Sequence, residues 1–116
     1  FSGRDDDIIT TAGYRVGPAD VESTLLEHAA VAESGVVAKP DEKRGSIIKA
    51  YVVIKAGQEP VDDQALKEEL QELVRRRLST HAYPREIEFV DELPKTPSGK
   101  IQRFVLRNRA QDEVPA

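Results

Sequence analysis

The stretch that decides the fold is Ile47-Ile48-Lys49-Ala50-Tyr51-Val52-Val53-Ile54-Lys55. Most of its residues are β-branched or aromatic, which are the types enriched in strands. Successive side chains of a strand point to opposite faces, so one face carries Ile48, Ala50, Val52 and Ile54. The other face carries Lys49, Tyr51, Val53 and Lys55. The stretch therefore predicts a strand, and the segment from Gly57 to Pro60 ends it.

Helical patterns precede and follow this strand. Pro18 suits the first position of a helix whose apolar residues recur at helical spacing, namely Val21, Leu25 and Ala29. Asp62 can cap a longer helix, and the apolar stripe of that helix consists of Leu66, Leu70, Leu73 and Val74. Pro84 marks the far side of its end. A last amphipathic helix is expected after Gly99.

Shorter β-prone segments complete the pattern. An acidic turn runs into a short β segment that ends at Thr11, and Ala12-Gly13 closes it. Residues 35–38 predict a short buried strand that Lys39-Pro40-Asp41 ends, and residues 86–90 alternate as a strand does. We predict an α+β fold: a small, mostly antiparallel three-stranded sheet, two helices on one face, and an N-terminal hinge and β segment. Residues 1–116 form one domain, in which 111–116 are expected to be a frayed tail.

Composition narrows the class of protein. With 116 residues, 33% of them charged and 39% apolar, the chain fits one small globular domain. A net charge of −4 argues against general nucleic-acid binding, and no apolar run predicts a membrane span. The absence of cysteine favours a cytoplasmic location, and two distant histidines, His28 and His81, predict no metal site. The chain contains no methionine, which predicts a fragment of a longer protein.

A proline- and glycine-rich segment raises the question of chemistry. Leu93-Pro94-Lys95-Thr96-Pro97-Ser98-Gly99-Lys100-Ile101 presents Lys100 just before a helical pattern. A phosphate-binding P-loop would need a glycine at position 94 and Ser or Thr at position 101, where this chain has Pro94 and Ile101. The segment therefore does not match the P-loop pattern, although it presents a lysine after a glycine.

Two motifs, in order, carry a resemblance. The stretch Gly3-Arg4-Asp5-Asp6-Asp7-Ile8-Ile9-Thr10-Thr11-Ala12-Gly13-Tyr14-Arg15-Val16-Gly17-Pro18-Ala19-Asp20-Val21-Glu22 resembles the hinge and loop of adenylate-forming enzymes. Residues 93–101 resemble the C-terminal lysine motif of the same superfamily. The chain is most similar to the C-terminal domain of acetyl- to medium-chain acyl-CoA synthetases, cut close to the hinge.

The resemblance implies roles in binding ATP or AMP. Lys100 would be the catalytic lysine of adenylation and would contact the nucleotide. Asp6 would be the hinge about which the domain rotates, although an ordinary acidic turn remains an alternative. Arg4 and Arg15 would contact the ribose or a phosphate, or else form salt bridges with the adjacent aspartates.

The resemblance also implies a surface for CoA. Ala12, Gly13 and Tyr14 would line the tunnel for pantetheine, unless Gly13 is simply a turn residue. Arg44 and Arg75 would meet the phosphates of CoA. The alternative for Arg75 is a basic cluster, Arg75-Arg76-Arg77, that is favoured by the dipole at the end of a helix.

The expected cofactors and partners follow from the same resemblance. ATP, CoA and a carboxylic acid would be the substrates, and Mg²⁺ would be bound mainly through a large N-terminal domain of the same chain. A lysine acetyltransferase and a deacetylase are possible partners at Lys100, and the isolated fragment is expected to be inactive. Two alternatives stay open: an adenylation enzyme that loads a carrier protein, and a non-catalytic binding module.

Overall fold

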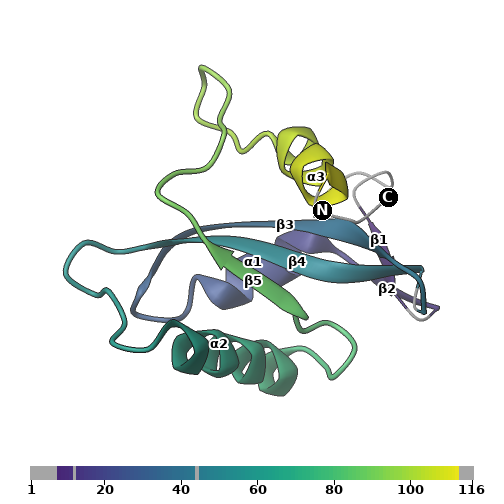
Figure 1. The fold of residues 1–116 in the computed structure, drawn as a ribbon, viewed down its shortest axis with the longest axis horizontal. Helices are drawn as coiled ribbons and strands as arrows, with labels where there is room; N and C mark the ends of the chain where they lie inside the picture. Colours follow the sequence, from purple (N-terminus) through teal and green to yellow (C-terminus); the bar gives the residue numbers. More distant parts are fainter. Residues whose placement is uncertain (1–7, 12, 44, 113–116) are drawn as a thin grey trace.

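The described part of this computed structural model comprises residues 8–11, 13–43 and 45–112. Its elements, in chain order, are β1 (Ile9–Thr11), β2 (Tyr14–Val16), α1 (Pro18–Leu25), β3 (Val31–Asp41), β4 (Gly45–Ile54), α2 (Asp63–Arg77), β5 (Glu86–Phe89) and α3 (Arg103–Asp112). Figure 1 shows helices above and below the sheet formed by β3, β4 and β5. The predicted α+β class is confirmed.

Strand β4 is the centre of this sheet. It pairs antiparallel with β3 along almost its whole length, and parallel with β5 over the shorter segment from Lys49 to Val52. The sheet is therefore mixed, with the long pairing antiparallel. The parallel pairing is possible because α2 lies between β4 and β5 in the chain. It returns the chain to the end at which β4 begins, so that β5 can run in the same direction as β4.

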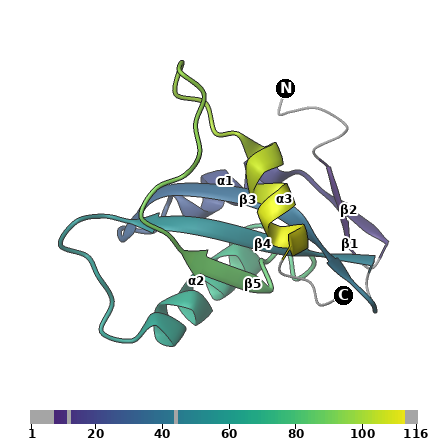
Figure 2. The ribbon, with the colours of Figure 1, turned by 45° about the horizontal axis from the view of Figure 1, so that its top comes forward.

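The two faces of β4 enter two different hydrophobic cores. The alternation in the sequence predicted which residues share a face, but not the second core. The first core lies on the face of α1 and α2, and its members from β4 are Ile48, Ala50 and Val52. The second core contains Tyr51, together with Leu93, Leu106 and Ala110, and lies under α3. Both views agree that α3 covers the face opposite to α2 (Figures 1 and 2). The prediction of two helices, α1 and α2, on one face of the sheet is thus confirmed, and α3 lies on the other face.

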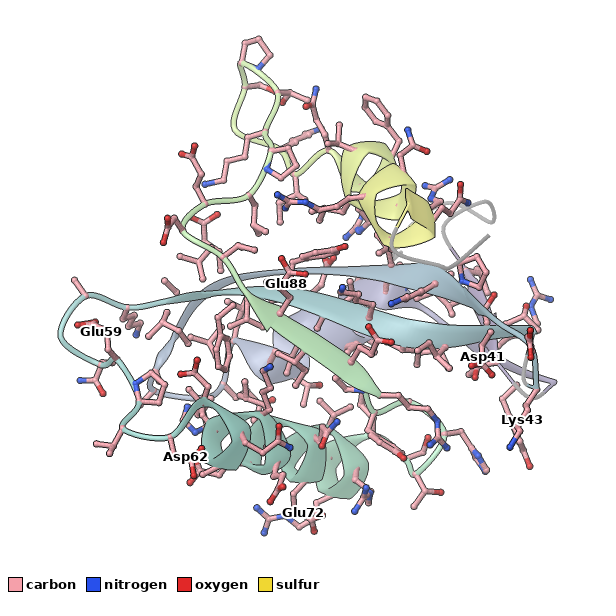
Figure 3. The ribbon with its side chains drawn as sticks, viewed as in Figure 1. Asp41, Lys43, Glu59, Asp62, Glu72 and Glu88 are labelled. Carbon is pink, nitrogen blue, oxygen red and sulfur yellow. The ribbon has the colours of Figure 1, made fainter. Side chains whose placement is uncertain are left out.

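The start of α2 follows the capping prediction. The carboxylate of Asp62 accepts hydrogen bonds from the backbone N–H groups of Gln64 (3.0 Å) and Ala65 (3.3 Å). Figure 3 places Asp62 at this end of the helix and Glu72 on its outer side. Leu66, Leu70 and Val74 are buried in the first core. In the described residues, no helix is both long and apolar enough to cross a bilayer.

Strand β3 is longer than predicted. Lys39-Pro40-Asp41 was expected to end it near residue 38, but the strand continues to Asp41, and Pro40 pairs with Ser46. Proline is tolerated at this position because β3 is an edge strand, where a missing N–H interrupts no pairing on the outer side. The proline therefore marks the edge of the sheet and does not end the strand.

The segment around Gly13 forms a hairpin that the sequence did not predict in full. The expected β segment is β1, but β2 was interpreted as part of a loop. Thr11 pairs with Tyr14 and Ile9 with Val16, which leaves a connection of two residues. Gly13 has a φ of 86°, a conformation that glycine adopts without strain and that short hairpin turns require. Buried Ile9 and Val16 attach the hairpin to the first core.

The last helix begins after Gly99, as predicted. The tail predicted to fray starts at residue 111. Gln111 and Asp112 are the last residues of α3, and residues 113–116 lie outside the described part of the chain.

Candidate functional site

Lys100 ends a tight turn in the connection between β5 and α3. The N–H of Thr96 donates to the carbonyl of Lys100 (2.8 Å), and the N–H of Gly99 donates to the carbonyl of Thr96 (2.9 Å). The hydroxyl Oγ1 of Thr96 accepts from the N–H of Lys100 at 3.1 Å. Gly99 has a φ of 90°, which glycine allows. Thr96 therefore fixes the backbone of Lys100 on both sides, while the side chain of Lys100 is exposed.

The two legs of this turn are held to each other and to the sheet. Lys95 and Ile101 form an isolated antiparallel bridge, and the N–H of Gln102 donates to the carbonyl of Pro94 at 2.9 Å. The ammonium of Lys95 lies 2.6 Å from a carboxylate oxygen of Glu33 in β3. The connection protrudes from the α3 side of the sheet (Figures 1 and 2), so a supported turn presents Lys100.

A buried carboxylate anchors the residues just after Lys100. Glu22 in α1 accepts a hydrogen bond of 2.9 Å from Nε of Arg103, and it also binds Nη2 of the same guanidinium. Its Oε2 accepts a second 2.9 Å bond from the N–H of Val36. Since Glu22 is buried, these contacts tie together α1, β3 and the first residue of α3.

A shallow hollow lies at the base of the Lys100 turn. Its volume is about 300 Å³, and its walls include Glu22, Glu33, Lys95 and Gly99. Two larger hollows, of about 420 and 360 Å³, are lined by none of the residues predicted as site residues. The described candidate site is therefore made of surface loops and does not lie in either of these two larger hollows.

The hairpin β1–β2 presents Gly13, Tyr14 and Arg15 at the surface. All three are exposed, and Arg15 pairs in register with Thr10. The ring of Tyr14 stacks on the imidazole of His81, with a distance of 3.6 Å between ring centroids and an angle of 11°. His81 belongs to the connection between α2 and β5, so the hairpin touches a segment far away in the sequence.

The predicted CoA residue Arg75 belongs to a cluster that the sequence analysis did not assemble. The guanidinium of Arg75 lies 4.5 Å from the ring centre of Tyr83, and that of Arg85 lies 5.0 Å from the same ring. Arg75 also binds Glu72 at 3.1 Å. Two guanidinium groups thus share one aromatic ring. The sequence shows Tyr83 and Arg85 close together in Tyr83-Pro84-Arg85, but only the folded structure shows that Arg75 contacts Tyr83.

The structure separates Lys100 from the residues of the hairpin, and Arg75 lies apart from the turn, beside Tyr83. The connection that carries Lys100 lies at the top of Figure 1, whereas β1 and β2 lie at its right edge, and Figure 2 shows the same separation. Lys100 and the hairpin are therefore not brought together. Arg4, Asp6, Ala12 and Arg44 lie outside the described residues.

In the part of the chain that the structure describes, no three His, Asp or Glu side chains gather in a way that could hold a metal ion. The expected Mg²⁺ therefore finds no fitting set of ligands among these residues.

Known proteins provide an independent comparison. The chain is 58% identical over 107 residues to acetyl-coenzyme A synthetase from Bacillus subtilis (strain 168), covering 92% of this chain and 18% of that protein. It is 51% identical over 109 residues to the mitochondrial acyl-coenzyme A synthetase ACSM5 of Homo sapiens, covering 94% of this chain and 19% of that protein. The chain thus spans about a fifth of the length of the curated relatives it matches.

Solved structures and a family model agree with this similarity. An acyl-CoA synthetase from Brucella canis superimposes with a TM-score of 0.86 at 57% identity, over 95% of this chain and 20% of that chain. The model of the AMP-binding enzyme C-terminal domain matches residues 20–100, which include most of α1 and the turn that ends at Lys100. The chain therefore belongs to the family of AMP-binding enzyme C-terminal domains.

Proposed function

We propose that this chain is the mobile C-terminal domain of an AMP-forming acyl-CoA synthetase that acts on acetate or a short- to medium-chain carboxylic acid. The observation that carries the proposal is the exposed Lys100, presented on a turn whose backbone Thr96 holds. The relatives named as acetyl- and acyl-coenzyme A synthetases support the reaction class.

In the first half-reaction, the carboxylate of the acid attacks the α-phosphorus of ATP, which forms an acyl-adenylate and releases pyrophosphate. Two anions approach each other, so negative charge builds on the phosphoryl oxygens. The ammonium of Lys100 stabilises this charge in the transition state more than it stabilises the separated substrates. Because the turn already holds the backbone of Lys100, little ordering is needed when the site closes.

In the second half-reaction, the thiol of CoA attacks the carbonyl of the acyl-adenylate and expels AMP. The hairpin with Gly13 and Tyr14 lies apart from the Lys100 turn, so the domain rotates to place each surface at one site in turn. We place the hinge at Asp6 and one wall of the pantetheine tunnel at residues 12–14. Arg4 and Arg15 contact the nucleotide.

The charged end of CoA binds the cluster of Arg75, Tyr83 and Arg85, with Arg44 as a further phosphate ligand. Both guanidinium groups contact the ring of Tyr83, and each offers several N–H donors to a phosphate.

The remaining groups of the enzyme lie outside this chain. A large N-terminal domain supplies the acid pocket and most contacts with ATP and Mg²⁺. Exposure of Lys100 also lets an acetyltransferase and a deacetylase reach it, which would switch its charge off and on. We propose a cytoplasmic location, as in the sequence analysis; the human relative is named as mitochondrial.

The test measures the two half-reactions of the full-length enzyme separately, with wild type, Lys100→Ala and the control Lys55→Ala. Lys55 is an exposed lysine of the connection after β4. Lys100→Ala should lower acyl-adenylate formation by a factor of about 100 or more. Thioester formation from supplied acyl-adenylate should largely survive. An equal fall in both half-reactions would show that Lys100 does not serve adenylation alone.

A second candidate is an adenylation enzyme that transfers the acyl group to a carrier protein. Free CoA, ATP and a series of carboxylic acids distinguish the two. Our proposal requires acyl-CoA to form with free CoA. If acyl transfer occurs only to a carrier protein, the acceptor proposed here is wrong while the adenylation chemistry stands.

A further inference from the structure

We propose that His81 is a positioning residue for the second half-reaction: by stacking on Tyr14 it holds the hairpin β1–β2 in the position in which CoA binds. The inference rests on the proposed function, because it assumes that CoA binds at the hairpin. Its starting observation is the contact between Tyr14 and His81, which lie far apart in the sequence.

The stack lies on the surface and adds little to either hydrophobic core. Tyr14 is 49% exposed and His81 is also exposed, yet their ring centroids are only 3.6 Å apart and nearly parallel. Tyr14 stands at the outer end of the hairpin, where it forms the last described pair of the ladder, with Thr11. Ile9 and Val16, at the other end of the hairpin, belong to the first core, and Thr11 is buried as well. The stack therefore holds the exposed side chain of Tyr14 against the connection between α2 and β5.

Hydrogen bonds and buried neighbours hold the segment that contains His81 in place. The N–H of His81 donates to the hydroxyl of Ser79 (3.2 Å), and the N–H of Ala82 donates to the carbonyl of Ser79 (3.2 Å). Ala82 and Pro84, which follow His81 in the chain, are buried. The amide of Gln71 in α2 donates to the carbonyl of Pro84 at 3.0 Å. A ring that stacks on His81 is thus held by the body of the domain.

The same segment also contains Tyr83 and Arg85, which form the basic cluster with Arg75. Residues 79–85 therefore contact the hairpin and build the cluster at once. In the proposed function these two surfaces bind the thiol arm and the charged end of one CoA molecule. The stack sets their spacing, so its loss should weaken CoA binding without touching adenylation.

The experiment uses the full-length enzyme with His81→Ala, His81→Tyr and Thr80→Ala. His81→Tyr keeps an aromatic ring that can stack, and Thr80→Ala alters the neighbouring exposed residue. We expect His81→Ala to raise KM for CoA by about 2- to 10-fold, the range that corresponds to one aromatic pair. The rate of acyl-adenylate formation and KM for ATP should stay at the wild-type values. His81→Tyr should restore most of the affinity for CoA.

A readout other than activity accompanies the kinetics. Backbone amide exchange at Tyr14 and Arg15 should accelerate in His81→Ala and not in Thr80→Ala. An unchanged KM for CoA in His81→Ala would overturn the inference. So would an equal fall in both half-reactions, because that is the effect of a general loss of stability. If Lys100→Ala leaves adenylation intact, the proposed function itself fails, so the two failures are distinguishable.

Discussion

The carboxylate of Glu22 in α1 binds the guanidinium of Arg103, which lies 81 residues further along the chain at the start of α3. The same carboxylate accepts the N–H of Val36 in β3, so one buried group joins the helices on both faces of the sheet. Removing it takes a charged acceptor away from a partly buried guanidinium and leaves the N–H of Val36 without the carboxylate that accepts it, which is costly.

We predict that Glu22→Ala lowers the free energy of unfolding by about 2–3 kcal/mol. Glu22→Gln keeps a carbonyl oxygen for Val36 and loses only the charge, so it should cost less. Urea denaturation of the purified domain measures both values. Equal losses for the two variants would show that the hydrogen bond to Val36 adds nothing beyond the charge pair.

Gly35 lies where α3 and the legs of the Lys100 turn meet β3. A Cβ at this position would come within 2.6 Å of the buried side chain of Leu106, and 3.6 and 3.7 Å from Leu93 and Ile101. We predict that Gly35→Val overpacks this site and lowers stability by about 1–3 kcal/mol. Gly45→Ala is a poor control because of its positive φ, so Ala32→Val at an exposed position of β3 serves instead. Thermal unfolding that is unchanged in Gly35→Val would contradict the close packing.

The hydroxyl of Thr96 should matter for catalysis although it touches no substrate in the proposed mechanism. It accepts the N–H of Lys100 (3.1 Å) and lies 2.9 Å from the hydroxyl of Ser98. Thr96→Val keeps the shape and removes the acceptor. We predict a fall in the rate of acyl-adenylate formation of about tenfold, because the backbone of Lys100 is less well positioned.

Thr96→Ser retains the hydroxyl and should keep most of the rate, while Ser98→Ala removes only the neighbouring contact. The measurement is pyrophosphate release in the full-length enzyme, with kcat and KM for ATP determined separately. A rise in KM alone, with kcat unchanged, would mean that Thr96 acts on ATP binding and not on the position of Lys100.

Much of the fold follows from periodicity in single segments. The alternation along β4 predicted which residues share a face of the strand, because the period of a strand is fixed by its backbone. The cap at Asp62 and the proline at the start of α1 were equally local signals. Predictions failed where neighbouring strands decide the outcome: Pro40 is compatible with β3 only because that strand is at the edge, and β2 is a strand only because β1 pairs with it.

The candidate site shows the same division. The turn around Lys100 was predictable from Pro94, Pro97 and Gly99, since its hydrogen bonds lie within a few residues, whereas the bonds of Thr96 came from the structure. The stack of Tyr14 on His81 and the packing of Arg75 on Tyr83 were not, because they depend on where the connection after α2 meets the hairpin. From the sequence, His81 was only one of two distant histidines, and nothing in it predicted the contact with Tyr14.

The basic cluster provides the last prediction, on recognition of the charged end of CoA. The guanidinium groups of Arg75 and Arg85 lie 4.5 and 5.0 Å from the ring centre of Tyr83, so both are held by contact with one side chain. If they bind the phosphate on the ribose of CoA, wild-type enzyme should prefer CoA to dephospho-CoA, which lacks that phosphate. The double variant Arg75→Gln/Arg85→Gln should raise KM for CoA by about tenfold and leave KM for dephospho-CoA nearly unchanged.

Arg76→Gln is the matched control, because Arg76 belongs to the same basic run, its side chain is 72% exposed, and it binds Glu72 only at 4.0 Å. The double variant removes two positive charges, that of Arg75 at the end of α2 and that of Arg85 before β5, and Arg76→Gln removes one at the end of α2. General electrostatic attraction would therefore weaken CoA binding in Arg76→Gln as well, by a smaller factor. Kinetics at two ionic strengths separate this long-range term from direct contact, since salt screens the former more strongly. If the double variant weakens CoA and dephospho-CoA by the same factor, Arg75 and Arg85 do not contact the phosphate that distinguishes them, and the cluster serves only to hold the connection after α2 in place.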